Sequence, residues 1–245
     1  MKVLDLFSGI GGFSLGFERA GMETVAFCEF EPHAQLILNK HWPSVPIHSD
    51  IRSLDGRQYK GSVDVVCGGF PCQDLSTAGK QSGFDGDRSG LYLEMLRIIS
   101  ECMPRYAVFE NVTGLLTGDS GRWFAQFLYD LAQIGYDAEW HCIEAAYVGA
   151  PHRRDRVWVI AYPSEERRER NISEKIRWEQ SFSWCKNGRR SQDLPDRSAL
   201  YPSKLCGSGD GIPKRVDRLA RLGNSVIPQI TEAIGRAIMD DNNQE

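Results

Sequence analysis

The sequence predicts an α/β protein with a doubly wound, Rossmann-like sheet. Two observations lead to this fold class. Short apolar runs rich in β-branched residues alternate with helical patterns over most of the 245 residues. Glycines or acidic side chains follow several of the runs, and open α/β sheets bind their ligands at that end of their strands. The length suits one main domain with a small insert.

The first unit is a strand, a glycine turn and a helix. Residues 3–7 form an apolar run, and residues 8–12 contain three glycines. A helical pattern follows, in which Phe13, Phe17 and Ala20 fall on one face. Glycines let the backbone approach a ligand, and the helix N-terminus favours negative groups. The unit is typical of a nucleotide-binding turn, although a structural turn has the same pattern.

Acidic residues follow the next two predicted strands. The strand over 24–28 ends at Glu29, about 20 residues beyond the glycine turn, where an acid can accept hydrogen bonds from ribose hydroxyls. After a helix that begins at Pro32, a third strand over 47–51 contains Asp50. Together with the glycine turn, Glu29 indicates a cofactor that contains a nucleoside.

A single cysteine follows the predicted strand that begins at Val63. The run breaks at Gly68-Gly69 and reaches Cys72 just beyond the end of the strand. Pro71 restricts the backbone beside the thiol, which aims Cys72 more narrowly than a flexible linker would. This stretch alone is equally consistent with two interpretations of Cys72, a catalytic nucleophile and a buried structural cysteine.

Two further features lie in the second half of the predicted sheet. A strand over 106–109 ends at Glu110, which we expect at the same sheet edge as Cys72. Three arginines occupy positions 153, 154 and 156, between two more predicted strands. Arginines so placed suit a ligand with phosphate or carbonyl oxygens, and a surface cluster of ion pairs with Asp155 is the alternative. The remaining predicted elements are helices over 91–102 and 123–134, strands over 136–146 and 157–161, and a C-terminal helix through Met239.

Periodicity fades in a basic segment near the C-terminus. Residues 163–215 contain 12 Lys and Arg against 8 Asp and Glu, whereas the whole chain has a net charge of −4. The sequence therefore predicts one main domain over 1–162 plus 216–245 and a small insert over 163–215. Three aromatic residues of this segment suit stacking on bases or a small core of its own: Trp178, Phe182 and Trp184.

The composition predicts where the protein occurs and which kinds of partner it lacks. No apolar run approaches the roughly 20 residues that span a bilayer, and the N-terminal residues do not resemble a signal peptide. The seven cysteines are scattered without a Cys-x-x-Cys pair, which fits neither a disulfide framework nor a zinc site. We expect a cytoplasmic monomer with no membrane or metal partner.

Five motifs in order resemble those of the cytosine-C5 DNA methyltransferases. The resemblance covers residues 1–162 and 216–239. The motifs are Asp5-Leu6-Phe7-Ser8-Gly9-Ile10-Gly11-Gly12, Gly69-Phe70-Pro71-Cys72-Gln73, Phe109-Glu110-Asn111-Val112, Arg154-Asp155-Arg156 and Gly223-Asn224-Ser225-Val226. The resemblance implies a Rossmann-like methyltransferase sheet that uses S-adenosylmethionine and acts on double-stranded DNA.

The resemblance also implies roles for individual residues. Cys72 would attack C6 of a cytosine turned out of the duplex, and Glu110 would hold N3 and the exocyclic amine. Arg156 would reach the cytosine O2 and Arg154 the flanking phosphate. The implied cofactor-binding residues are Phe7, Gly9, Gly11, Glu29, Phe30, Asp50, Ile51, Phe70, Asn224 and Ser225.

The chain departs from the family pattern in two places. His152 stands where the family usually has Gln, and no separate arginine-rich motif precedes Gly223. The resemblance implies that 1–162 plus 216–245 is the catalytic and cofactor-binding domain and that 163–215 is a small target-recognition region. Because this region is short, we expect a short target, relaxed specificity or dependence on a partner. Three alternatives share some of these motifs: a tRNA cytosine-C5 methyltransferase, a non-catalytic DNA-binding relative and a dinucleotide oxidoreductase. The first usually carries a Cys-Phe-Thr tripeptide, which does not occur here.

Overall fold

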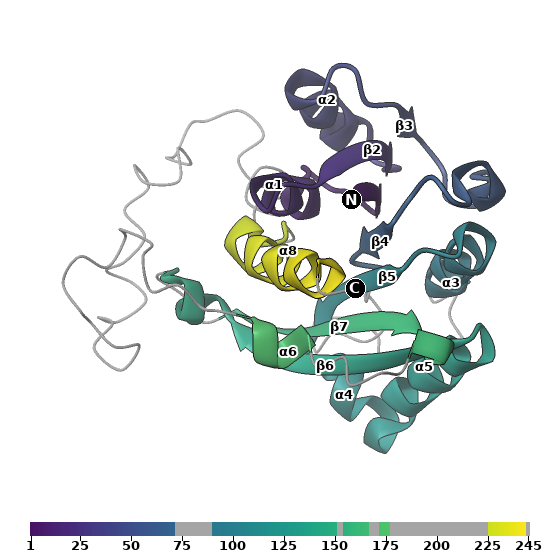
Figure 1. The fold of residues 1–245 in the computed structure, drawn as a ribbon, viewed down its shortest axis with the longest axis vertical. Coiled ribbons are helices and arrows are strands. Elements are labelled where there is room, and N and C mark those ends of the chain that lie inside the picture. Colours follow the sequence, from purple (N-terminus) through teal and green to yellow (C-terminus); the bar gives the residue numbers. More distant parts are fainter. Residues whose placement is uncertain (72–89, 151–153, 167–171, 177–224, 244–245) are drawn as a thin grey trace.

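The computed structural model describes residues 1–71, 90–150, 154–166, 172–176 and 225–243. In these parts of the chain, seven strands form one sheet in the order β3-β2-β1-β4-β5-β7-β6, with helices on both faces (Figure 1). The predicted Rossmann-like α/β fold class is confirmed. None of the helices in the described ranges is long and apolar enough to span a membrane.

The observed elements follow the predicted order closely. The strands are β1 (Lys2–Leu6), β2 (Glu23–Cys28), β3 (Ile47–His48), β4 (Val65–Gly68), β5 (Tyr106–Val112), β6 (Tyr136–Glu144) and β7 (Asp155–Pro163). The α-helices are α1 (Gly12–Arg19), α2 (Pro32–His41), α3 (Gly90–Cys102), α4 (Gly114–Thr117), α5 (Arg122–Gln133), α6 (Ile172–Lys175) and α8 (Pro228–Asn242). The third strand is shorter than expected because its partner β2 ends at Cys28, so Asp50 lies on the turn beyond β3.

The order of the parallel strands reverses beside the centre of the sheet, between β1 and β4. Strands β1 to β5 run parallel, whereas β7 is antiparallel to β5 and β6 is antiparallel to β7. From β1 the chain continues outward through β2 and β3, and then returns to place β4 on the other side of β1. Ligands of open α/β sheets bind at such a switch point, beyond the carboxyl ends of the strands.

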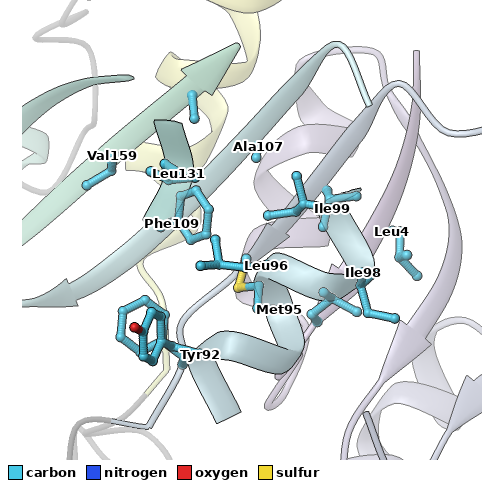
Figure 2. Packing of buried hydrophobic residues seen from close by; sticks show 14 of the residues in the cluster. Leu4, Tyr92, Met95, Leu96, Ile98, Ile99, Ala107, Phe109, Leu131 and Val159 are labelled. Carbon is cyan, nitrogen blue, oxygen red and sulfur yellow. The ribbon is translucent and has the colours of Figure 1, made fainter. Parts of the chain in front are cut away.

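Alternating side chains along the strands feed two cores, one on each face. On β5, Ala107 and Phe109 join the core beneath α3 and α5, while Tyr106 and Val108 join the core beneath α1 and α8. Successive residues of a strand point to opposite faces, and burial of both faces explains the continuous apolar runs in the sequence. Figure 2 shows side chains of α3, including Met95, directed toward the strands.

The C-terminal helix joins the N-terminal half of the sheet. Helix α8 packs against α1, and Thr231 Oγ1 donates to the carbonyl of Gly12 at 3.3 Å. Near its other end, Asp241 accepts hydrogen bonds from Tyr106 Oη and Lys175 Nζ, both at 2.6 Å. These contacts join α8 to the N-terminal half of the sheet, and the domain over 1–162 plus 216–245 stays a prediction. The segment 163–215 lies mostly outside the described residues, and its boundaries stay a prediction.

Candidate active site

A cavity of about 740 Å³ opens at the switch point of the sheet. Its walls come from the residues that follow β1, β2, β3 and β4, from the end of β5 and from the start of β7. Ten of the residues singled out in the sequence line it: Phe7, Gly9, Glu29, Phe30, Asp50, Ile51, Phe70, Glu110, Arg154 and Arg156. Elements far apart in the chain therefore contribute to one site.

Glu29 is held at the end of β2 by the glycine turn. Its Oε2 accepts a hydrogen bond from the Gly9 amide at 2.7 Å, and its Oε1 accepts one from the Glu31 amide at 2.8 Å. Phe7, at the end of β1, has a φ of 51°, in the left-handed region that side chains other than glycine rarely adopt. Strained backbone of this kind clusters at ligand sites.

Of the predicted cofactor residues that the structure describes, Gly11 and Ser225 are not among those lining the cavity. Gly11 caps α1 with a φ of 86°, and a Cβ there would lie 2.5 Å from the Trp42 ring, so this glycine permits close packing against α2. Ser225 Oγ donates to the carbonyl of Val226 at 3.2 Å. Asn224 lies outside the described residues. A role of each in cofactor binding stays a prediction.

Glu110 and the two arginines meet through the pairing of β5 with β7. Val112 lies opposite Arg156, which makes Arg156 a diagonal neighbour of Glu110 on the same face. Arg156 Nε lies 3.0 Å from Glu110 Oε1, and Arg154 Nη2 lies 3.9 Å from it. Asp155, the alternative partner for the arginines, accepts a hydrogen bond from Arg156 Nη1 at its backbone carbonyl, at 2.9 Å.

The environment of Glu110 favours its protonated form. The residue is 8% exposed, and this burial raises the pKa of its carboxyl group. The charges of Arg156 and Arg154 oppose the rise without cancelling it. A carboxyl group that retains its proton nearer neutral pH can donate a hydrogen bond or a proton to a ring nitrogen.

Phe70, two residues before the predicted nucleophile, is held by aromatic packing. Cys72 lies outside the described residues, but Phe70 and Pro71 line the cavity. The Phe70 ring packs against Phe127, with ring centroids 5.8 Å apart. Asn111 Nδ2 donates to the Phe70 carbonyl at 3.4 Å, and Asn111 itself lines the cavity. The sequence alone predicts no role for Asn111, although its place beside Glu110 at a strand end is a local sign that it belongs to the site.

Asp5 lies on β1 behind the cavity, and ionisation of its carboxyl group makes the stability of the fold depend on pH. Its side chain is fully buried, and Oδ2 accepts a hydrogen bond from Ser14 Oγ at 2.7 Å. Burial is the main cause that raises its pKa to about 7. The unfolded value is about 4, so Asp5 stabilises the fold most below about pH 4. This contribution is lost as the pH rises to about 7.

The Asp5→Asn variant isolates this contribution, because Asn keeps an acceptor for Ser14 but does not titrate. The unfolding free energy of the wild type, taken relative to the variant, should fall by on the order of 4 kcal/mol between about pH 4 and pH 7. Urea unfolding of both proteins across this range measures the difference. A difference in unfolding free energy between the two proteins that stays constant from about pH 4 to pH 7 would contradict the prediction.

The chain is similar in sequence to known methyltransferases. The family described as C-5 cytosine-specific DNA methylase matches residues 1–201. The type II methyltransferase M2.BsuMI of Bacillus subtilis is 39% identical over 165 residues, or 66% of this chain and 42% of the relative. The type II methyltransferase M.Eco47II of Escherichia coli is 34% identical over 216 residues, or 87% of this chain and 50% of the relative.

A solved structure shares the fold over nearly the whole chain. The methyltransferase EhMeth of Entamoeba histolytica has a TM-score of 0.69 at 16% identity, covering 99% of this chain and 98% of that protein. In contrast, the chain spans about half the length of the curated relatives it matches. The match over 1–201 shows that the chain belongs to the C-5 cytosine-specific DNA methylase family.

Proposed function

We propose that this protein is a DNA (cytosine-5-)-methyltransferase that uses S-adenosylmethionine to methylate a cytosine turned out of duplex DNA. The observation that carries the proposal is the buried Glu110, paired with Arg156 in the wall of the same cavity that holds Glu29. One side of this cavity suits a nucleoside and the other suits a pyrimidine. The curated relatives are named type II methyltransferases, which supports a role in DNA modification.

The residues present fit the adenosine part of S-adenosylmethionine. Each carboxylate oxygen of Glu29 accepts one backbone hydrogen bond and retains a lone pair for a ribose hydroxyl. Phe7, Phe30 and Ile51 supply apolar surface for the adenine. When bound, S-adenosylmethionine supplies an electrophilic methyl group.

The residues of the chain would activate the cytosine. The Cys72 thiolate would add to C6, forming a C–S bond, while the π electrons of the C5–C6 double bond shift to C5–C4 and those of C4–N3 shift to N3. Glu110 donates to N3 as negative charge develops there, which makes C5 nucleophilic. Arg156 holds the O2 and Arg154 the flanking phosphate. C5 would then take the methyl group, with S-adenosylhomocysteine leaving, and Glu110 would recover its proton from N3. Water acting as the base would remove the C5 proton, and the electrons of that C–H bond would restore the C5–C6 double bond as the C6–S bond breaks and returns the thiolate.

Acceptor choice tests the function. The purified chain would be incubated with S-adenosylmethionine labelled in its methyl group and, separately, with a pool of duplex DNA and a pool of tRNA. We expect label in the DNA, and bisulfite sequencing then reports the target site. Label in tRNA alone would favour a tRNA methyltransferase. Label in neither pool would favour a non-catalytic DNA-binding relative.

Phe30 should matter for the cofactor and little for stability. Its side chain is 75% exposed at the cavity, so Phe30→Ala should change the unfolding free energy by less than about 0.5 kcal/mol. Loss of the ring should weaken S-adenosylmethionine binding about tenfold, or about 1.4 kcal/mol. Titration calorimetry measures the affinity. Leu36→Ala is the matched control, because Leu36 is 66% exposed on α2 and does not line the cavity; equal losses in the two variants would disprove the assignment.

A further inference from the structure

One wall of the cavity is a turn, not a strand. Asp50, Ile51 and Arg52 line the cavity, although β3 ends at His48. Asp50 Oδ1 accepts a hydrogen bond from the Arg52 amide at 3.0 Å, and the carbonyl of Asp50 accepts one from the Ser53 amide at 3.2 Å. These bonds shape the turn from within. The position of the turn relative to the sheet depends on the element beside it.

That element is α3, and Arg97 makes the connection. Arg97 Nη2 donates to the carbonyl of Ile51 at 2.8 Å, and Nη1 donates to the carbonyl of Leu54 at 3.0 Å. The guanidinium is itself oriented by Glu94, at 2.8 Å from Nε, and by Glu101, at 3.0 Å from Nη1. All three guanidinium nitrogens are therefore engaged. A planar fork with several fixed donors can hold two carbonyls at once, which an ammonium group cannot match.

The far end of the same segment is attached to α3 as well. Glu101 Oε2 accepts a hydrogen bond from the Gly56 amide at 2.7 Å, and Cys102 Sγ donates to the Gly56 carbonyl at 3.2 Å. The approach is close, because a Cβ on residue 56 would lie 2.9 Å from Glu101. Segment 51–56 thus follows the position of α3.

Helix α3 is a rigid base for these contacts. Met95, Ile98 and Ile99 are fully buried against the sheet (Figure 2). Closely packed cores resist displacement, so the helix presents Arg97 at a fixed place. We propose that Arg97 is a positioning residue for cofactor binding, which holds the turn at residues 50–52 where the adenosine part of S-adenosylmethionine contacts it. This inference rests on the proposed function of the cavity.

The position of Arg97 predicts a specific kinetic signature. Without it, binding of S-adenosylmethionine must order the turn, and that ordering lowers affinity. Glu110, assigned to the cytosine, lies on β5, away from the turn at residues 50–52, and should keep its geometry. Removal of Arg97 should therefore raise the Kd for the cofactor while kcat at saturating cofactor changes little.

Three variants of the full chain test the proposal by titration calorimetry with S-adenosylmethionine. Arg97→Met should raise the Kd about tenfold or more, and Arg97→Lys should restore part of the affinity because an ammonium can still reach one carbonyl. Both should keep kcat within about twofold of the wild type. The matched control is Arg57→Met. Arg57 belongs to the same stretch but is exposed and pairs with Asp55, so its loss should leave the Kd unchanged.

A double-mutant cycle distinguishes positioning from a general loss of stability. If Arg97 acts through the turn, the effects of Arg97→Lys and Asp50→Ala on the Kd should be non-additive, because both perturb the same wall. This arm uses the conservative variant and holds even if Arg97→Met fails to fold. A wild-type Kd in the Arg97 variants, an equal loss in Arg57→Met, or strict additivity would overturn the role of Arg97. No binding to the wild-type chain would instead overturn the proposed function and this inference with it.

Discussion

Replacing Glu110 with Gln is expected to lower the rate of methyl transfer to DNA by about 10²- to 10⁴-fold. Gln keeps the size of the side chain and can hydrogen-bond to the base, but it cannot transfer a proton to N3. The affinity for S-adenosylmethionine should stay within about twofold, because Glu29 and Phe30 lie on another wall of the cavity. Single-turnover transfer of a labelled methyl group measures the rate, and calorimetry measures the affinity.

The pH profile gives a second signature of Glu110. Burial raises its pKa, so the protonated form that donates to N3 is present at low pH and is lost as the pH rises through that value. The wild-type rate should therefore decline as the pH rises above the pKa of Glu110. The residual rate of Glu110→Gln should not show this decline. Glu23→Gln is the matched control, since Glu23 is exposed at the start of β2 and should keep the wild-type rate and profile. A variant at position 110 with full activity would exclude an acid role.

Replacing Cys72 with Ser should cause a loss of more than about 10³-fold in the rate of transfer. The hydroxyl of Ser is far less acidic than a thiol, so almost none of it is ionised at neutral pH. Cofactor affinity should not change, because the change is confined to the nucleophile. The measurement is again single-turnover transfer to duplex DNA.

Trapping of the adduct would identify the nucleophile directly. In DNA that contains 5-fluorocytosine, addition of the thiolate to C6 and methylation of C5 leave no C5 proton to remove. The C6–S bond then persists, and the protein–DNA complex should survive denaturing electrophoresis. Cys142→Ser, which changes an exposed cysteine on β6, should still form this complex. A complex formed equally well by Cys72→Ser would show that another residue is the nucleophile.

Much of the site could be predicted because its signals are local. A glycine turn after β1 and an acid directly after β2 are properties of short stretches, and strand ends of a parallel sheet meet at one edge. Glu29, Asp50 and Glu110 were therefore predicted to lie together, and all three line the cavity. The role of Gly11 was not visible locally, because it depends on the ring of Trp42 at the end of α2.

The sequence by itself determined the fold class, the order of the elements and the strand ends that carry reactive side chains. Hydrophobic periodicity and turn-forming residues are properties of short stretches of sequence, so they predict strands, helices and turns before the tertiary structure is known. Only the tertiary structure decided that Arg156 pairs with Glu110 and that Arg97 holds the carbonyl of Ile51. The first contact requires the antiparallel register of β7 on β5, and the second requires the docking of α3 beside a turn, where Arg97 lies 46 positions after Ile51 in the chain. Such contacts arise from the packing of distant segments, which no short stretch of sequence encodes.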